Sequence, residues 1–284
     1  MKKSLLAVAI AATFVLAACG QEAKAEATVF GSVEQRIEMS GGTSNIDGDD
    51  NYIGVKLKED LGNGMSAIGI ISFDLNTEAN STATVKDQYV GLTDGTTTIT
   101  AGRVKNFIKQ NGVTDIFEGT TFRPAAQKRV DSSVQATTSV SGVKVGLGAH
   151  ADDTANTQDG VDTYEAMVGL DLGSVSVTAS YEKNQTTLVE NKMIGAKASV
   201  AGATVGATYE LDNNDVATTT ITAKTVMGSN TLKGGYETIE NGTNTYIAEL
   251  QHNFTKNTSA YINYSDNDAA NSDATTMIGM RMKF

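Results

Sequence analysis

The sequence of 284 residues contains one proline, one cysteine and no tryptophan. A single cysteine excludes an intrachain disulfide, and with it a small scaffold held together by disulfides. The longest apolar stretch, residues 5–18, is shorter than the roughly 20 residues that a membrane-spanning helix needs. The scarcity of proline, together with abundant glycine, threonine, serine and asparagine, is typical of extended strands joined by flexible turns. These features argue against a helical bundle.

Basic residues are also in the minority, with 22 Lys and Arg against 33 Asp and Glu and a formal net charge of −11. Because a nucleic-acid partner needs a basic surface, we expect none. Residues for catalysis are sparse too: His150 and His252 fall in different predicted strands, and no Gly-rich nucleotide loop or metal-spaced cluster is seen. The acidic pairs at 49–50 and 152–153 are interpreted as solvated loop residues. We therefore expect no enzyme activity, no cofactor and no metal site.

The N-terminal segment predicts export, because Lys2 and Lys3 precede the apolar run as in a secretory signal. Two cleavage sites compete. The Ala-Lys-Ala triplet at residues 23–25 predicts a signal peptide of residues 1–25 and a mature domain of residues 26–284. Alternatively, the sequence Leu-Ala-Ala before Cys19 matches a lipoprotein box, with Cys19 as the lipidated N-terminus. Either site exports the chain.

Residues 51–76, NYIGVKLKEDLGNGMSAIGIISFDLN, show the strand pattern most clearly. Ile53, Val55 and Leu57 alternate with glycine or lysine, a turn rich in Gly and Asn follows, and alternation resumes from residue 65. This pattern predicts a β-hairpin with one apolar and one polar face. No helical segment in the sequence is available to cover the apolar face, which must therefore meet lipid or a second sheet.

The same alternation predicts sixteen strands along the mature chain. They are 27–39, 53–58, 65–74, 88–93, 97–104, 132–138, 143–150, 163–170, 174–182, 191–200, 203–211, 217–226, 231–238, 244–254, 258–265 and 274–284. Short turns and longer or acidic loops alternate between them. This asymmetry predicts an all-β, antiparallel transmembrane barrel, in which short turns gather at one rim and loops at the other.

Aromatic residues support a barrel over a β-sandwich, in which they would be scattered along the strands. They are expected near the two ends of the strands and on the apolar side, as in the aromatic girdles of membrane barrels. The loop-end tyrosines are Tyr164, Tyr181, Tyr209, Tyr236, Tyr246 and Tyr264, and the turn-end phenylalanines are Phe254 and Phe284.

The run GVKLKEDLGNGM at residues 54–65 resembles the second and third strands of Gram-negative general porins of the neisserial and burkholderial type. The terminal run TTMIGMRMKF, which ends in Phe284, is similar to the signal read by the barrel-assembly machinery. The resemblance implies a sixteen-stranded outer-membrane barrel in contact with lipid, passive diffusion of small hydrophilic solutes and a homotrimer. Gly31, Gly91 and Ala101 are small residues that would allow close approach of a neighbouring subunit.

The resemblance also implies that the long interruption at residues 105–131 is a third loop folded into the lumen. Asp115 and Glu118 resemble the acidic residues that this loop presents at the pore constriction. Arg103 resembles the arginine that ends the fifth strand, and Arg129 begins a run similar to the one that follows the loop. Facing acidic and basic side chains create a transverse field that favours polar solutes.

Arg36, Lys56 and Lys58 alternate onto the predicted lumen face and are expected to complete the basic wall, with Glu34 and Glu38 as possible partners of Arg36. Where members of the family commonly carry arginine, this chain has Tyr52. Together with the acidic mouth loops, this difference predicts mild cation selectivity. A solute-specific channel, for instance for phosphate or small carboxylates, and a plugged structural or adhesin barrel are the alternatives.

Overall fold

The structure is a computed structural model that describes residues 25–75, 82–119, 122, 128–151, 160–185 and 187–284. Residues 1–24 of the predicted signal segment, Cys19 among them, lie outside the described residues. Within the described ranges, no helix is long and apolar enough to cross a membrane.

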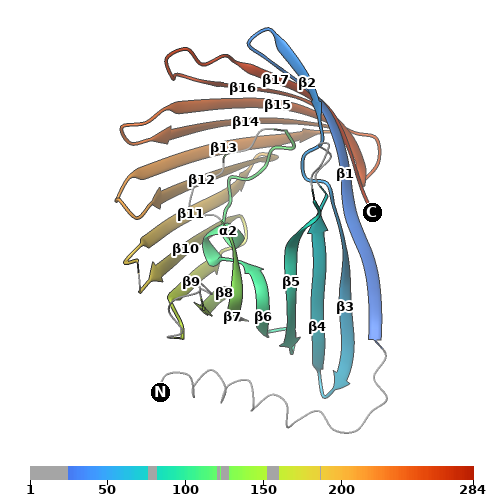
Figure 1. Cartoon of the computed structure of the whole chain (residues 1–284), viewed down its shortest axis with the longest axis vertical. Helices are drawn as coiled ribbons and strands as arrows, with labels where there is room; N and C mark the ends of the chain where they lie inside the picture. Colours follow the sequence, from blue (N-terminus) through green and yellow to red (C-terminus); the bar gives the residue numbers. More distant parts are fainter. Residues whose placement is uncertain (1–24, 76–81, 120–121, 123–127, 152–159, 186) are drawn as a thin grey trace.

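Strands form nearly all of the described chain (Figure 1). In chain order they are β1 (Ala25–Ser40), β2 (Thr43–Asp47), β3 (Tyr52–Gly62), β4 (Met65–Asp74), β5 (Thr84–Thr93), β6 (Thr97–Lys105), β7 (Arg129–Val140), β8 (Val143–His150), β9 (Thr163–Asp171), β10 (Val175–Asn184), β11 (Glu190–Val200), β12 (Ala203–Leu211), β13 (Ala217–Met227), β14 (Asn230–Ile239), β15 (Asn244–Asn253), β16 (Thr258–Asn267) and β17 (Thr275–Lys283).

Sixteen of these strands, β1 and β3–β17, form a closed antiparallel barrel. Each strand from β3 to β17 pairs with its neighbour in sequence, and the ring closes where β1 pairs with β17 from Ser32↔Lys283 to Ser40↔Thr275. The lower part of β1 pairs with β3, from Ala25↔Glu59 to Ser32↔Tyr52. The predicted barrel and its strand number are confirmed.

The short strand β2 differs from the prediction, which placed residues 40–50 in a loop. It folds back on β1, from Arg36↔Asp47 to Ser40↔Thr43, and extends the wall beyond the paired part of β3. The wall is interrupted between β2 and β3 at residues 48–51, where Asp50 has a φ of 45°. This interruption turns several polar side chains toward the lumen.

The wall is apolar outside and polar inside, the reverse of a soluble barrel. In β12, Val205 and Tyr209 are 41% and 44% exposed on the outer face, whereas Thr208 and Glu210 are buried on the inner face. A shift of one residue in register would exchange the two faces, so the pattern fixes the pairing. An apolar outer band is what lipid requires.

The predicted outer-face aromatic positions largely agree with the structure. Tyr164, Tyr209, Tyr246, Tyr264, Phe254 and Phe284 are exposed, whereas Tyr181 and Tyr236 are half-buried. At one short turn, Asn63 and Gly64 both have positive φ values, of 53° and 78°, as tight hairpins require. Tyr261, for which no position was predicted, is buried on the inner face.

Candidate functional site

The described part of the segment between β6 and β7 folds into the lumen (Figure 1). It begins with a single helical turn, α2 (Phe107–Gln110), capped by the Asn106 side chain, which accepts from the Lys109 N–H. Phe107 and Ile108 are almost completely buried, and Phe117 is 7% exposed. We refer to the described part of this segment, residues 106–119 and 122, as the inward loop. The predicted inward fold of the third loop is therefore seen.

The start of the inward loop is attached to β9 and β10. The Phe107 N–H donates to Glu165 Oε2 at 2.7 Å, and Asn106 Nδ2 donates to Glu182 Oε2 at 3.0 Å. The two carboxylates belong to β9 and β10 and are buried. Hydrogen bonds to charged groups contribute about 1.5–3 kcal/mol each, so these contacts hold the helical turn against the wall.

An aromatic pair attaches the loop farther on. Phe117 and Phe122 meet edge to face with ring centroids 5.7 Å apart, and they pack with Ile247 of β15. A Cβ added at Gly235 of β14 would lie 2.5 Å from Phe122 and 2.9 Å from Phe117. The absence of a side chain at this position makes room for the aromatic pair.

Glu249 of β15 binds the loop backbone next to this pair. The N–H groups of Glu118 and Gly119 donate to Glu249 Oε2 at 2.9 and 3.1 Å. Lys233 Nζ lies 2.7 Å from the same carboxylate, and Asn263 Nδ2 donates to it at 2.9 Å. Each oxygen of this buried carboxylate is therefore partnered, as burial of a charge requires.

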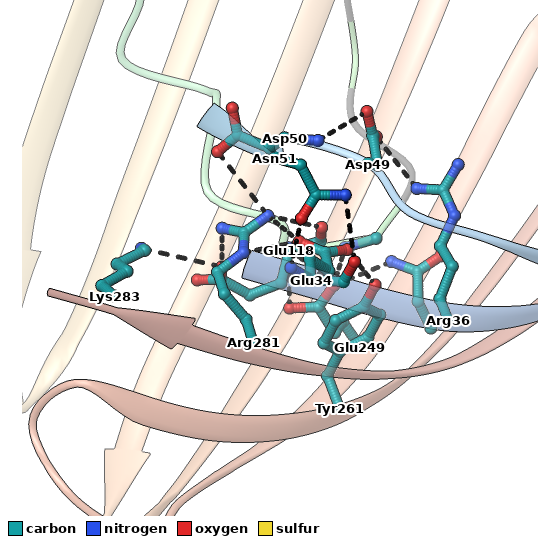
Figure 2. Close-up of polar contacts among 12 residues, drawn as sticks. Glu34, Arg36, Asp49, Asp50, Asn51, Glu118, Glu249, Tyr261, Arg281 and Lys283 are labelled. Carbon is teal, nitrogen blue, oxygen red and sulfur yellow. Dashed lines mark hydrogen bonds and ion pairs between the residues drawn. The ribbon is translucent and has the colours of Figure 1, made fainter. Parts of the chain in front are cut away.

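The Glu118 carboxylate is bound by Arg281 of β17 (Figure 2). Arg281 also pairs with Glu34 of β1, whose other oxygen accepts from the Tyr261 hydroxyl at 2.5 Å. Lys233 Nζ lies 3.6 Å from Glu118. The loop acid is thus neutralised by cations of the last strands, and none of the five predicted basic residues contacts it among the described groups.

The interruption between β2 and β3 adds acidic groups to the same region (Figure 2). Asn51 joins this segment to β1, because its Oδ1 accepts from the Glu34 N–H at 2.6 Å and its Nδ2 donates to the Glu34 carbonyl at 3.1 Å. Asp49 accepts from Arg36 at 2.9 Å, and Asp50 accepts from Lys86 at 2.7 Å. The acidic pair at 49–50, interpreted from the sequence as solvated, therefore lies against wall cations instead, and the pair at 152–153 lies outside the described residues.

The predicted basic residues do not gather at one place. Arg36 lies on the lumen face among Asp49, Asp47 and Glu38, at 2.9, 3.5 and 3.7 Å. The Glu38 contact was anticipated, but Glu34 pairs with Arg281 instead. Lys56 and Lys58 lie farther along β3 toward its turn; Lys56 Nζ stacks over the Phe30 ring at 4.7 Å.

The two arginines that flank the loop have different surroundings. Arg129 Nε donates to Asp87 at 2.8 Å on the lumen face. Arg103 lies on the outer face, where its NH1 donates to Asp131 at 2.6 Å and its Nε to the Val85 carbonyl at 3.1 Å. Within β6 the alternation is regular and puts Arg103 on the same face as Ala101, while the irregularity in the β6–β7 register adds its extra residue on β7, where Ser132 has a φ of 47°. The expected position of Arg103 in the constriction is therefore wrong.

Asp115, the second predicted loop acid, lines a recess of about 360 Å³ between the loop and the inner wall. Lys197 of β11 and Lys224 of β13 line the same recess. These two lysines, like Arg281, Lys233, Lys86 and Glu249, were missed at the sequence level. Alternation alone identifies them as inward-facing charges, but it does not say which of them the loop meets.

Comparison with known proteins gives a consistent result. No curated protein sequence matches the chain. Among solved structures, an anion-selective porin from Comamonas acidovorans is 17% identical, with a TM-score of 0.76 over 92% of this chain and 100% of that chain. OmpF of Salmonella typhi, in a complex with daunomycin, is 14% identical, with a TM-score of 0.76 over 91% of this chain and 97% of that one.

The trimer form of OmpT, an outer membrane protein of Vibrio cholerae, is 16% identical, with a TM-score of 0.72 over 92% of this chain and 99% of that chain. At these identities the likeness shows the fold alone. The sequence profile described as Gram-negative porin matches residues 5–272, nearly the whole chain. The chain belongs to the Gram-negative porin family.

Proposed function

We propose that this porin lets small hydrophilic solutes and ions diffuse passively across the outer membrane, with a mild preference for cations. The observation that carries the proposal is the inward loop, which is attached to β9 and β10 at its start and to β14–β17 through Phe117 and Glu118. A loop held against one side narrows the lumen. The polar inner wall supplies the aqueous lining that such a channel needs.

The preference for cations follows from how the wall charges are paired. Arg36 faces three carboxylates, and Lys86 lies 2.7 and 2.8 Å from Asp50 and Asp74. Arg281 is shared between Glu34 and Glu118. A cation already surrounded by carboxylates offers little attraction to a passing anion, because the nearby charges cancel its field. Rings of acidic groups favour cations.

Conductance in planar bilayers tests the diffusion proposal. Reconstituted protein is expected to give channels whose current rises in proportion to salt concentration, and proteoliposomes are expected to swell in small sugars. Saturation of the current by phosphate or a small carboxylate would favour a solute-specific channel. Channels that neither conduct nor allow swelling would indicate a plugged barrel and contradict the proposal.

We propose further that the porin is a homotrimer and that the outer face of β3–β7 contacts a neighbouring subunit. A groove there is lined by Gly69, Val90 and Ala101 together with the Arg103–Asp131 pair. A charged pair facing lipid is unfavourable, at a cost for an arginine that rises from about 0–1 kcal/mol near the interfaces to about 2–4 kcal/mol at the bilayer midplane. Of the other small residues, Gly31 packs against Phe284 of its own chain, and Gly91 lies on the inner face.

Export and assembly complete the proposal. We infer that a signal peptide of residues 1–25 is removed, which leaves a mature domain of residues 26–284 that keeps all of β1 except Ala25. Phe284 is half exposed on the outer face, and its backbone pairs with Gly31 at 2.9 and 3.1 Å. We infer that the pattern that ends in Phe284 is recognised by the barrel-assembly machinery, and the exposure of this side chain supports the inference.

A further inference from the structure

Three buried side chains converge on the inner face of β8, β9 and β10, beneath the start of the inward loop. They are His150, Glu165 and Glu182, which are 4%, 3% and 2% exposed. One ligand atom of each lies within 4.8 Å of the other two. Such a cluster of one imidazole and two carboxylates has the donor types of a transition-metal site.

One nitrogen of this cluster lacks a hydrogen-bond partner among the described groups. His150 Nδ1 lies 2.5 Å from Ser133 Oγ, whereas the buried Nε2 makes no hydrogen bond and lies 3.1 Å from Glu165 Oε1. When Nδ1–H donates to the serine hydroxyl, Nε2 presents its lone pair toward the carboxylates. This is the arrangement in which a metal-binding histidine is oriented by its second nitrogen.

The two carboxylates oppose each other directly. Glu165 and Glu182 are register partners on adjacent strands, and like charges placed opposite each other destabilise a sheet. Among the described residues, one lysine lies within ion-pair distance of these two carboxylates. It is Lys128, whose Nζ is 2.8 Å from Glu182 Oε1 and whose side chain is 46% exposed. One ammonium leaves the pair with excess negative charge, which a divalent cation would compensate.

The carboxylates are also held in place from outside the cluster. Gln135 Nε2 and the Phe107 N–H donate to the two oxygens of Glu165 at 2.5 and 2.7 Å. Asn191 and Asn106 donate to the two oxygens of Glu182 at 3.1 and 3.0 Å. Outer partners of this kind orient ligands and typically change metal affinity by about 10–100-fold when they are removed.

We propose that His150, Glu165 and Glu182 bind one divalent transition-metal ion of the Zn²⁺ class. Three protein ligands with a remaining position for water is a common zinc arrangement, and the imidazole favours such an ion over Mg²⁺ or Ca²⁺. The half-exposed Lys128 side chain would be displaced from Glu182 when the ion enters from the lumen. Because Glu165 and Glu182 also hold Phe107 and Asn106, the bound ion would tie the wall to the start of the inward loop.

Zinc titration of the untagged, EDTA-treated protein in detergent tests this site independently of any channel activity. The matched control is His252→Ala, because His252 is the only other histidine and lies on β15 near Asn230 and Phe254. We expect one Zn²⁺ per chain in the wild type and in His252→Ala. His150→Ala is expected to lose the binding, and Glu182→Gln to weaken it at least tenfold.

A second measurement covers the case in which His150→Ala does not fold. In the zinc-loaded His252→Ala protein, His150 is the only imidazole left, and the zinc X-ray absorption spectrum is expected to show one imidazole among oxygen ligands. Ser133→Ala, which keeps all three ligands, is expected to weaken binding by about tenfold. An all-oxygen shell, no stoichiometric binding by the wild type, or equal binding by folded His150→Ala would each overturn the proposal.

Discussion

Glu118 of the inward loop and Arg281 of the last strand form an ion pair on the inner wall, although 163 residues separate them in sequence. Arg281 also binds Glu34 of the first strand, so one guanidinium joins the loop to both strands at the closure of the barrel. The path of the loop and the closure of the ring are therefore coupled.

The substitution Arg281→Met should uncouple the path of the inward loop from the closure of the barrel. Glu34 and Glu118 would keep their negative charges without their main partner, and breaking a buried pair in this way costs about 3–5 kcal/mol. We expect a lower free energy of unfolding in urea titrations from lipid vesicles, together with noisier single-channel currents. Lys283→Gln is the matched control, because Lys283 Nζ lies 3.9 Å from Glu118 on a half-exposed side chain. Equal effects of the two substitutions would contradict this role of Arg281.

Glu249→Gln should release the loop backbone. In either orientation the amide nitrogen of glutamine would face a donor, either the Lys233 ammonium if it replaces Oε1 or the N–H groups of Glu118 and Gly119 if it replaces Oε2, so a buried hydrogen bond that supports the loop would be lost. An unsatisfied buried donor costs about 1–3 kcal/mol. We expect single channels with a higher mean conductance and more frequent substates. Glu237→Gln on neighbouring β14, where the carboxylate accepts from Thr220 at 3.0 Å, should leave the conductance unchanged.

Gly234 and Gly235, which are adjacent on β14, provide a matched pair of variants. Gly235→Ala places a methyl group against Phe122 and Phe117 and should displace the aromatic pair, at a cost of about 1–3 kcal/mol for overpacking. Gly234→Ala meets nothing within 4 Å. We expect the first variant to change single-channel conductance and the second to match the wild type. If both variants conduct as the wild type does, the aromatic pair does not set the position of the loop.

Alternation explains why the fold was predictable and why the loop contacts were not. Ile278, Met280 and Met282 mark the outer face of the last strand, and they thereby place Arg281 inside. Its partner depends on where the loop crosses the lumen, which no local pattern encodes. Arg103 shows a second limit, this one of the resemblance, because alternation from Ala101 already places its side chain on the outer face whereas the resemblance assigned it to the constriction. The interruption at residues 48–51 shows a third limit, because it separates β2 from β3 and the alternation does not continue across it.

The outer pair Arg103–Asp131 provides a test of the trimer. Arg103→Asp would leave two carboxylates facing each other in the groove, and we expect it to reduce the fraction of trimer recovered by crosslinking in native membranes. The double variant Arg103→Asp, Asp131→Arg restores opposite charges and should recover part of the oligomer. A monomer in native membranes, detected by crosslinking of the wild type, would contradict the trimer itself.

The zero-current potential across a planar bilayer under a KCl gradient tests the central claim most directly. The acidic groups around Arg36, Lys86 and Arg281 predict a potential of the sign produced by a channel that passes K⁺ more readily than Cl⁻. The preference should decrease as salt concentration rises, because screening shortens the reach of the wall charges. A potential of the opposite sign would mean that the basic side chains dominate the constriction, and would contradict the account.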